Sequence, residues 1–289
     1  ALIIIILFSG YQASSGGDFT IGNLSKFIAY FNTLTWPMMA IGQLINIRSQ
    51  GKASLERINA LLDYPVEIKD EDVVDVEIKG HITFNNLTFQ YPGSNINALE
   101  NICLDIPQGT SVGILGRTGS GKTTLVDMLL RLYNVEKESI FIDGVDIMNV
   151  GLKNLRDNIG YVPQDNFLFS KTVLDNICFS EESNDLEKAK LYAKYASVDT
   201  NIEDFPEKYD TVLGERGVTL SGGQRQRISI ARAMIKDPAI LILDDSVSAV
   251  DTETEEKILS YLKQTRKNKT TILVAHRIST VKDMDLIVL

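Results

Sequence analysis

The sequence is poor in cysteine and carries no excess of basic charge. Its two cysteines, Cys103 and Cys178, lie far apart and form no C-x-x-C pair, so neither a disulfide framework nor a zinc site is indicated. Lysine and arginine number 29 against 38 acidic residues, which gives a net charge of -9. This balance argues against a nucleic-acid-binding surface. The length of 289 residues allows one large domain or two smaller ones.

A targeting signal is also lacking, because the apolar start has neither a basic leader nor a small-residue cleavage site. Residues 1–8 are too short to cross a bilayer, and we expect them to be the tail of a membrane helix whose beginning is missing. A polar loop is expected over 9–23. Residues 24–47 are long enough to cross, but their polar side chains require a bundle interior or a watery cavity. The unusual residues are Asn32, Pro37, Gln43 and Asn46.

Basic residues follow this segment, whereas the preceding loop carries one acidic residue, so the chain after residue 47 is expected on the cytoplasmic side. The alternative is a pair of amphipathic helices in a soluble domain. A polar helix is predicted over 48–62, and Tyr64-Pro65 should end it. An acidic stretch without helical period then indicates a linker over 63–80.

A glycine-rich loop organises the remaining sequence. It has the pattern G-x-x-x-x-G-K-[ST], with a strand predicted before it over 111–115 and a helix after it over 124–133. Its backbone N–H groups and the helix N-terminus can bind phosphate. Lys122 can neutralise the β- and γ-phosphates, and the Thr123 hydroxyl can coordinate Mg²⁺. The alternative is a turn that binds nothing. The predicted nucleotide-binding residues here are Gly116, Arg117, Thr118, Gly119, Ser120, Gly121, Lys122, Thr123 and Thr124.

Strand and helix patterns alternate through the rest of the chain. The strands 239–243 and 271–274 are continuous apolar runs, as expected for strands buried on both faces. The alternation indicates an α/β domain with a largely parallel core. Asp244 ends an apolar strand beside the loop and is the natural ligand or anchor of Mg²⁺. The other predicted strands cover 81–84, 87–91, 139–143 and 159–163, and helices are predicted over 185–196 and 224–236.

The run Leu220 to Gln224 resembles the signature motif of the ATP-binding cassette (ABC) superfamily, and further motifs follow the family's order. Residues 214–217 resemble the segment that precedes the signature in exporters, and residues 248–251 resemble the D-loop. The resemblance implies an α/β P-loop NTPase (ABC ATPase) domain with a helical subdomain, which binds ATP and Mg²⁺. It assigns nucleotide or catalytic roles to Tyr91, Gln164, Ser221, Gly222, Gly223, Gln224, Asp251 and His276.

Each of these roles has a plainer alternative. Tyr91 is implied to stack on adenine, or else is a core aromatic. Gln164 is implied to offer its amide oxygen to Mg²⁺ or to the attacking water, or else lies in a surface turn. The serine-glycine turn at Ser221 is implied to bind the γ-phosphate of ATP held by the opposite subunit, or else is an ordinary helix cap. His276 is implied to hold the γ-phosphate, or else is a core histidine.

The resemblance also extends to the N-terminal part. Residues 51–58 resemble the helix that joins the last membrane helix of an ABC exporter to its nucleotide-binding domain. This implies a partial all-α transmembrane domain over 1–62, with one complete membrane helix near 24–47, and a cytoplasmic nucleotide-binding domain over 81–289. We therefore expect a fragment, truncated at both ends, of a multi-pass half-transporter of the cell membrane, in contact with lipid. The transported substrate stays open.

One residue departs from the family pattern. Asp245 follows Asp244 where the family usually places the glutamate that polarises the attacking water. The missing methylene withdraws the carboxylate by roughly 1.5 Å, and a misplacement of about 1 Å can cost on the order of 10²-fold in rate. With its intact signature, the chain is predicted to be the degenerate partner in a heterodimer of two half-transporters. The retained His276 leaves a homodimer or a weakly active site open.

Two other function classes stay open at this point. One is a soluble ABC-type ATPase that acts on DNA or ribosomes, which the acidic charge and residues 24–47 oppose. The other is a regulatory ATP-binding subunit with negligible hydrolysis.

Overall fold

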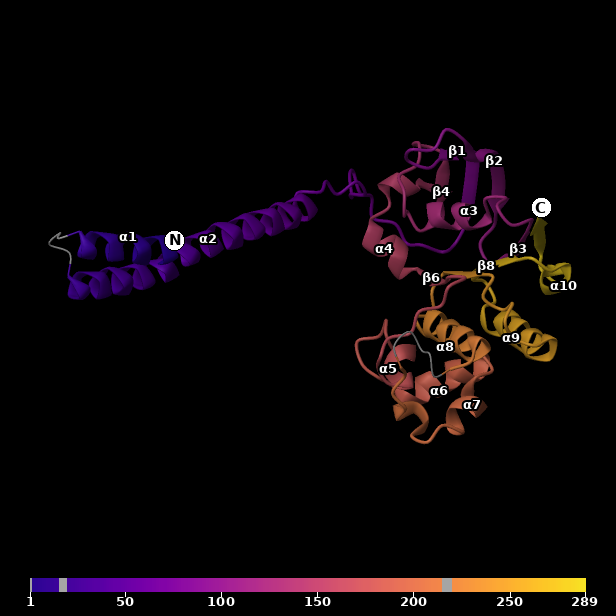
Figure 1. Ribbon diagram of the computed structural model, residues 1–289. Helices are drawn as coiled ribbons and strands as arrows, with labels where there is room; N and C mark the ends of the chain where they lie inside the picture. Colours follow the sequence, from indigo (N-terminus) through magenta and orange to yellow (C-terminus); the bar gives the residue numbers. More distant parts are fainter. Residues whose placement is uncertain (1, 16–19, 215–219) are drawn as a thin grey trace. The chain divides into compact units, whose positions relative to one another are not determined.

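The computed structural model describes residues 2–15, 20–214 and 220–289 (Figure 1). The chain divides into two compact units, Ala1–Val66 and Glu67–Leu289, called here the first and second unit. The division falls inside the predicted linker.

The first unit consists of helices in its described residues. Helix α1 (Leu2–Ser14) continues through the first part of the expected polar loop, so that prediction is wrong for residues 9–14. Within the helix the Ser9 hydroxyl donates to Ile6 O at 3.3 Å, and directly after it the Ser15 hydroxyl donates to Tyr11 O at 2.8 Å, so both hydroxyls find acceptors among the carbonyls of α1. Residues 16–19 of the expected loop lie outside the described residues.

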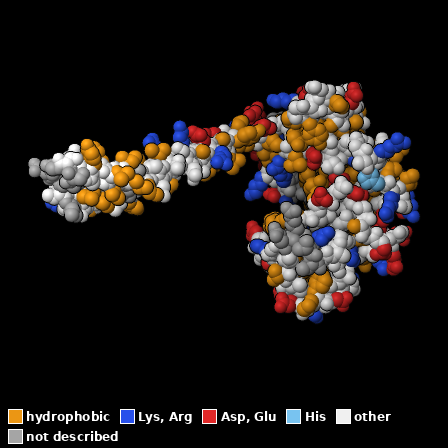
Figure 2. All heavy atoms as spheres, viewed as in Figure 1, with side chains coloured by type: hydrophobic (Ala, Val, Ile, Leu, Met, Phe, Trp, Pro, Cys, Tyr) orange, Lys and Arg blue, Asp and Glu red, His pale blue; other side chains and the backbone are white. Residues whose placement is uncertain are grey.

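Helix α2 (Ile21–Leu62) is continuous through the segments 24–47 and 48–62, and it ends before Tyr64, both as expected. Its apolar side chains are largely exposed, among them Trp36 at 76% and Met38 at 73% (Figure 2). In the described parts of the chain, however, no helix has the length and hydropathy together that a membrane crossing requires. The predicted crossing over 24–47 is therefore not confirmed.

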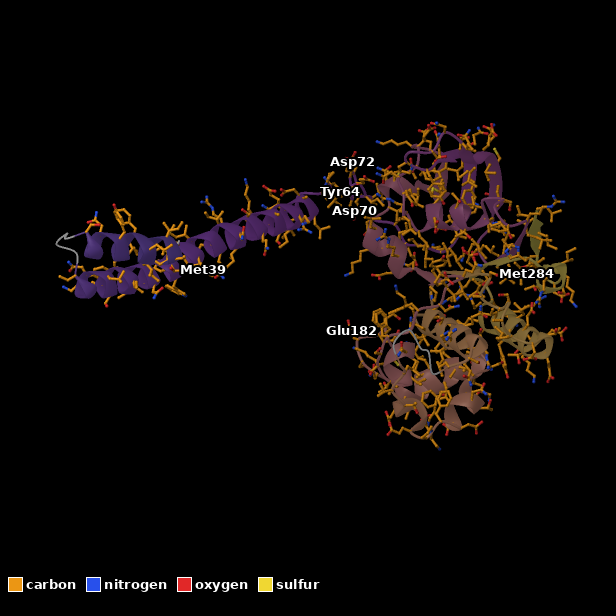
Figure 3. The ribbon with its side chains drawn as sticks, in the orientation of Figure 1. Met39, Tyr64, Asp70, Asp72, Glu182 and Met284 are labelled. Carbon is orange, nitrogen blue, oxygen red and sulfur yellow. The ribbon has the colours of Figure 1, made fainter. Side chains whose placement is uncertain are left out.

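The second unit begins with a segment without regular structure, which hydrogen-bonds to residues 149–154 of the same unit. The Asp70 carboxylate accepts from the Leu152 N–H at 2.9 Å, and the Asn149 amide donates to Asp72 O at 3.0 Å (both aspartates are labelled in Figure 3). The Asn154 amide likewise donates to Val76 O at 2.7 Å. Residues 67–80 thus lack regular structure but belong to the fold of the second unit.

An antiparallel sheet with the strand order β2-β1-β4-β5 follows. The two predicted strands 81–84 and 87–91 form one bulged strand, β1 (Ile82–Gln90), whose register shifts after Phe84. Its neighbour β2 (Asn97–Ile106) was not predicted, because its buried and exposed positions do not alternate regularly. The short strands β4 (Ile140–Ile142) and β5 (Val145–Asp146) complete the sheet.

The core sheet is parallel, as predicted, with the order β6-β7-β8-β3-β9. Its strands are β6 (Ile159–Val162), β7 (Ile240–Asp244), β8 (Thr270–Ala275), β3 (Ser111–Leu115) and β9 (Leu286–Val288). Every residue of β7 and β8 is buried. Strand β7 serves two hydrophobic cores, because Leu241 and Leu243 join one cluster and Ile240 and Ile242 the other.

Helices cover this sheet and form a separate layer around α8 (Figure 1). Helices α5 to α8 pack together in one hydrophobic cluster, which confirms the predicted helical subdomain. The described helices of the second unit are α3 (Lys122–Leu129), α4 (Leu152–Asp157), α5 (Val173–Ile177), α6 (Leu186–Tyr195), α7 (Asp199–Glu203), α8 (Gly222–Ile235), α9 (Thr252–Thr265) and α10 (Ile278–Val281), with 3-10 turns η1 (Ile147–Asn149) and η2 (Lys208–Asp210).

Helix α3 is shorter than predicted, ending at Leu129 rather than Tyr133. Arg131 ends it because its backbone takes a φ of 45° and its side chain is fully buried. The guanidinium donates to Val150 O at 2.9 Å and to Lys69 O at 2.8 Å. Backbone carbonyls of two separate segments thereby hold the turn after α3, and the Arg156 guanidinium donates to the turn's own carbonyl, Arg131 O, at 2.9 Å.

Candidate functional site

The carboxyl ends of adjacent parallel strands collect the predicted site residues at one edge of the sheet. Strand β6 leads to Gln164, β7 ends at Asp244, β8 leads to His276, and β3 leads into the glycine-rich loop. The register aligns these ends, since Val162 pairs with Leu243, Asp244 with Val274, and Leu115 with Ala275. Ligands of open α/β sheets bind at this edge.

The glycine-rich loop has a backbone that side chains would obstruct. Gly119 and Gly121 have φ values of 82° and 88°, in the left-handed region. A Cβ on Gly121 would lie 2.7 Å from Ala98 O. The buried Lys122 ammonium donates to the carbonyls of Gly116 and Arg117, each at 2.9 Å, and so folds back into the loop. The loop therefore holds a cation at the N-terminus of α3, an arrangement suited to phosphate.

Asp244 is almost fully buried, 2% exposed, at the end of β7. Burial raises the pKa of this carboxyl, while the hydrogen bond from Thr123 lowers it, and Asp245 raises it further. Among the described residues, none donates a hydrogen bond to its Oδ2. A buried carboxylate oxygen with a free lone pair, beside a threonine hydroxyl, fits the oxygen ligands that Mg²⁺ takes.

Tyr91 lies beside the start of α3, with its hydroxyl 2.9 Å from the Thr124 hydroxyl. Its half-buried ring packs edge-to-face against Phe89 and Tyr133, with centroids 5.1 and 5.3 Å apart. The structure thus brings Tyr91 to the loop. Stacking on adenine stays a prediction.

Asp245 and His276 line one cavity of about 180 Å³, together with Ser248, Glu255 and Arg277. Asp245 has a φ of 47°, a conformation that aspartate adopts more readily than glutamate does. Its backbone is fixed on both sides, because its N–H donates to Val274 O at 3.0 Å and its carbonyl accepts from the Ser248 hydroxyl at 2.8 Å. Two of the three predicted catalytic side chains therefore share one cavity, and the third, Gln164, does not line it.

Gln164 lies at the same edge of the sheet, two residues after β6, and is exposed. The hydrogen bond described for it is at its backbone carbonyl, which accepts from the Asn166 amide at 3.5 Å. Its predicted role toward Mg²⁺ or water stays a prediction.

The signature turn caps α8. The Ser221 hydroxyl accepts from the Gln224 N–H at 3.2 Å, and the Gln224 side chain accepts from the Ser221 N–H at 3.0 Å. A Cβ on Gly223 would lie 2.9 Å from Ala249 O, so the turn packs closely on the D-loop. Asp251 ends that loop and caps α9 by accepting from the Thr254 N–H at 3.0 Å. Residues 215–217 of the segment before the signature lie outside the described residues.

The family follows from a match along the chain itself. Residues 99–248, more than half of the chain, match the family described as "ABC transporter". The chain belongs to the ABC transporter family.

Relatives with known names support this assignment. The "Probable multidrug resistance ABC transporter ATP-binding/permease protein YheI" of Bacillus subtilis (strain 168) is 44% identical over 272 residues, covering 93% of this chain and 46% of the relative. The "Alpha-hemolysin translocation ATP-binding protein HlyB" of Proteus vulgaris is 38% identical over 288 residues, covering 100% of this chain and 41% of the relative. This ABC family chain thus spans about half the length of the curated relatives it matches.

A solved structure agrees with the fold. The "Structure of a bacterial Atm1-family ABC exporter with ATP bound" aligns with a TM-score of 0.80 and 34% sequence identity, over 100% of this chain and 51% of that chain. The predicted family, its ATPase class and its P-loop fold are confirmed.

Sequence reasoning missed two buried side chains of this ABC domain. Gln226 on α8 accepts from the Ala249 N–H at 3.2 Å and, at 3.5 Å, donates to Asp245 O, which links the signature helix to the end of β7. The sequence offered one signal for Gln226, which is its position two residues after Gln224, the last residue of the signature motif. Glu255 gave none, because it is one acidic residue among several in the run from 251 to 256.

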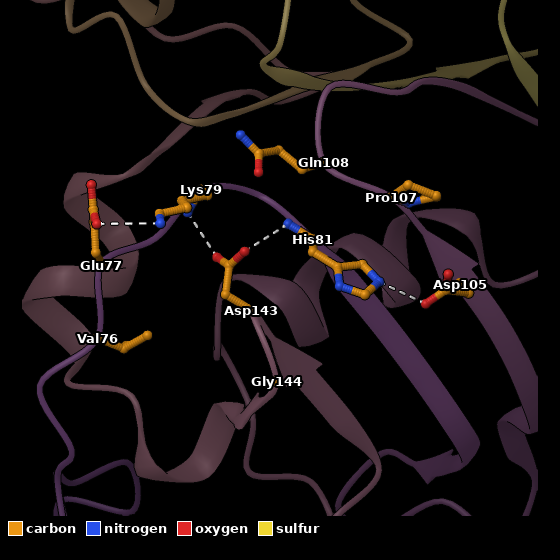
Figure 4. Close-up of a pocket in the computed structure, with 9 residues that line it drawn as sticks. All are labelled: Val76, Glu77, Lys79, His81, Asp105, Pro107, Gln108, Asp143 and Gly144. Carbon is orange, nitrogen blue, oxygen red and sulfur yellow. Dashed lines mark hydrogen bonds and ion pairs between the residues drawn. The ribbon is translucent and has the colours of Figure 1, made fainter.

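A second cavity of the described residues lies elsewhere, at the start of β1, and at about 600 Å³ it is larger than the one beside Asp245 (Figure 4). It contains His81 and Asp105, joined at 2.8 Å, and Asp143, whose carboxylate accepts from the N–H groups of Lys79, Gly80 and His81. No residue predicted to bind nucleotide lines it. Cavity size therefore does not identify the candidate site here.

Proposed function

We propose that this chain is the ATP-binding and ATP-hydrolysing part of an ABC exporter half-transporter. The observation that carries the proposal is the convergence of the Lys122 loop, the buried Asp244 and His276 at one edge of the parallel sheet. The names of the relatives support transport, since YheI is called an ATP-binding/permease protein and HlyB a translocation ATP-binding protein.

Different groups of the loop bind different parts of the triphosphate. The backbone N–H groups around Gly119 and Gly121 hold phosphate oxygens, and Lys122 exchanges its loop carbonyls for the β- and γ-phosphates. Mg²⁺, when bound, neutralises charge on these phosphates. Thr123 and Asp244 supply oxygen ligands for it, and Gln164 offers a further one. Tyr91 stacks on the adenine, and Asp251 borders the nucleotide from the D-loop.

Hydrolysis requires a carboxylate that orients water and a group that holds the γ-phosphate. Asp245 takes the first role and His276 the second, which their shared cavity permits. The turn from Ser221 to Gln224 acts on ATP held by a second subunit, because its N–H groups and the N-terminus of α8 form an anion site. Closure around two ATP molecules then drives export, and hydrolysis reopens the dimer.

We propose further that the second subunit is a different half-transporter with an intact glutamate. The short Asp245 side chain and its left-handed backbone support a slow site on this chain. Replacing Asp245 with glutamate should raise hydrolysis at this site, up to on the order of 10²-fold, with a small loss of stability from the strained backbone. Unchanged hydrolysis in Asp245→Glu would remove the degenerate-site proposal and favour a homodimer or a regulatory subunit.

In the full-length protein we place the first unit with the membrane domain and the second unit in the cytoplasm. The exposed apolar side chains of α2 support a partner or lipid around it. The cargo is not specified by these residues.

The proposal is tested with the full-length protein in lipid vesicles. Cysteine cross-linking between signature turn and glycine-rich loop should increase with Mg²⁺ and ATP, and Ser221→Arg should prevent it. Equal cross-linking with and without nucleotide would contradict the proposed motor.

A further inference from the structure

Glu255 is a buried carboxylate that the proposed reaction does not use. It lies in the first turn of α9, is 5% exposed, and lines the cavity that contains Asp245 and His276. Buried carboxylate oxygens are normally hydrogen-bonded. Yet no described residue donates a hydrogen bond to the Glu255 Oε1. This oxygen can therefore accept a hydrogen bond from a donor in the cavity.

The cavity offers four side chains that can donate. They are those of Ser248, His276, Arg277 and Thr280. The Ser248 hydroxyl already donates to Asp245 O at 2.8 Å. Arg277 caps the N-terminus of α10 and Thr280 lies within that helix, whereas His276 directly follows β8, whose residue Val274 pairs with Asp244 at the end of β7. His276 therefore lies at the strand ends and also lines the cavity that contains Glu255.

We propose that Glu255 is a positioning residue for His276, accepting one ring N–H at Oε1 and so directing the other ring nitrogen toward the phosphate site. A carboxylate partner fixes the tautomer and the orientation of a functional histidine in this way. Glu255 itself touches no reacting atom. The inference rests on the proposed function, because a fixed His276 matters only where a γ-phosphate is held.

Stability distinguishes this role from a structural one. A carboxylate that held the fold together would destabilise the protein when replaced. Even with one hydrogen bond from His276, a buried carboxylate scarcely compensates for its loss of hydration, so an apolar side chain of the same length should leave the melting temperature unchanged or raise it. Glu255→Met supplies such a side chain, and Glu255→Gln keeps an amide oxygen in the same place. Glu256→Gln, at an exposed position of α9, is the matched control.

The orientation of the ring can be measured without nucleotide. The chain has two histidines, so ¹⁵N-histidine labelling gives two ring systems, with His81 in the other cavity as the internal reference. We expect one dominant neutral tautomer for His276 in the wild type, a mixture in Glu255→Met, and an intermediate state in Glu255→Gln. His81 should be unchanged throughout. Identical His276 spectra in the wild type and Glu255→Met would overturn the inference.

Single-turnover hydrolysis by the full-length transporter gives the second readout. Glu255→Met should lower the rate at least about tenfold with little change in KM, and should have no further effect in a His276→Ala background. Additive losses, or a melting temperature that falls by several degrees, would show that Glu255 acts elsewhere. A wild type that does not hydrolyse ATP would defeat the proposed function, while the tautomer result would still decide the inference.

Discussion

Two cavities of the second unit both contain carboxylates, and the two sets are bonded differently. In the larger cavity, Asp143 accepts from three backbone N–H groups, and Asp105 accepts from His81 and from the Thr83 hydroxyl at 2.8 Å. In the smaller, Glu255 has an unpaired oxygen. Bonded carboxylates hold a fold, whereas unpaired buried ones retain capacity for a ligand. In these two cavities, unpaired buried carboxylate oxygens therefore indicate the candidate site better than the volume of the cavity does.

The largest expected effect comes from comparing two lysines. Lys122→Ala should lower ATP hydrolysis on the order of 10²–10³-fold, because it removes the preorganised cation at the phosphates. Lys79→Ala, in the larger cavity, should leave hydrolysis unchanged, since its side chain pairs only with Glu77 at 3.5 Å among the contacts described. Steady-state ATPase assays on both variants measure the contrast. Equal losses would mean that the two cavities are not functionally distinct.

Asp143 provides the reverse comparison. Asp143→Ala should lower the free energy of unfolding by about 2–3 kcal/mol, because three N–H groups lose a charged acceptor. ATP affinity of the folded fraction should not change. Urea unfolding and nucleotide titration test the two statements, with Asp143→Asn as a milder control that keeps one acceptor oxygen. A variant that is stable but binds ATP weakly would reverse the assignment of the cavities.

Asp105 gives the smallest effect and a pH dependence. Hydrogen bonds from His81 and Thr83 lower the pKa of its carboxyl in the folded protein. Their contribution to stability is therefore complete above the ordinary aspartate pKa of about 3.9 and is lost as the pH falls through the lowered value. Asp105→Asn should cost less than about 1 kcal/mol at pH 7, as exposed pairs do. The melting temperatures of the two proteins should converge as the pH falls through that lowered pKa, and a difference that persists at still more acidic pH would contradict this account.

The sequence predicted those parts of the fold that depend on local pattern. The apolar run before Asp244 and the glycine-rich loop each specify their own conformation, and both lie where expected. Strand β2 was missed because its buried and exposed positions do not alternate regularly. Helix α9 was missed although its Asp251 cap and acidic first turn are local signals of a helix start. Helix α3 ended early because Arg131 finds its carbonyl partners in segments remote in sequence.

The site shows the same limit. Motifs identified Lys122, Asp244 and His276, because loop, strand end and spacing are visible in the sequence. They did not identify Glu255 or Gln226, whose importance comes from burial. An acidic residue in the run from 251 to 256 is normally solvated, and only the packing of α9 buries Glu255 while Glu256 stays exposed.

The central claim is that nucleotide binds at the carboxyl edge of the parallel sheet and not in the larger cavity. The two histidines report on one cavity each, His276 on the smaller and His81 on the larger. Titration of Mg²⁺ and ATP into the ¹⁵N-histidine-labelled protein should move the ring signals of His276 and leave those of His81 in place. Movement of the His81 signals alone would contradict the account.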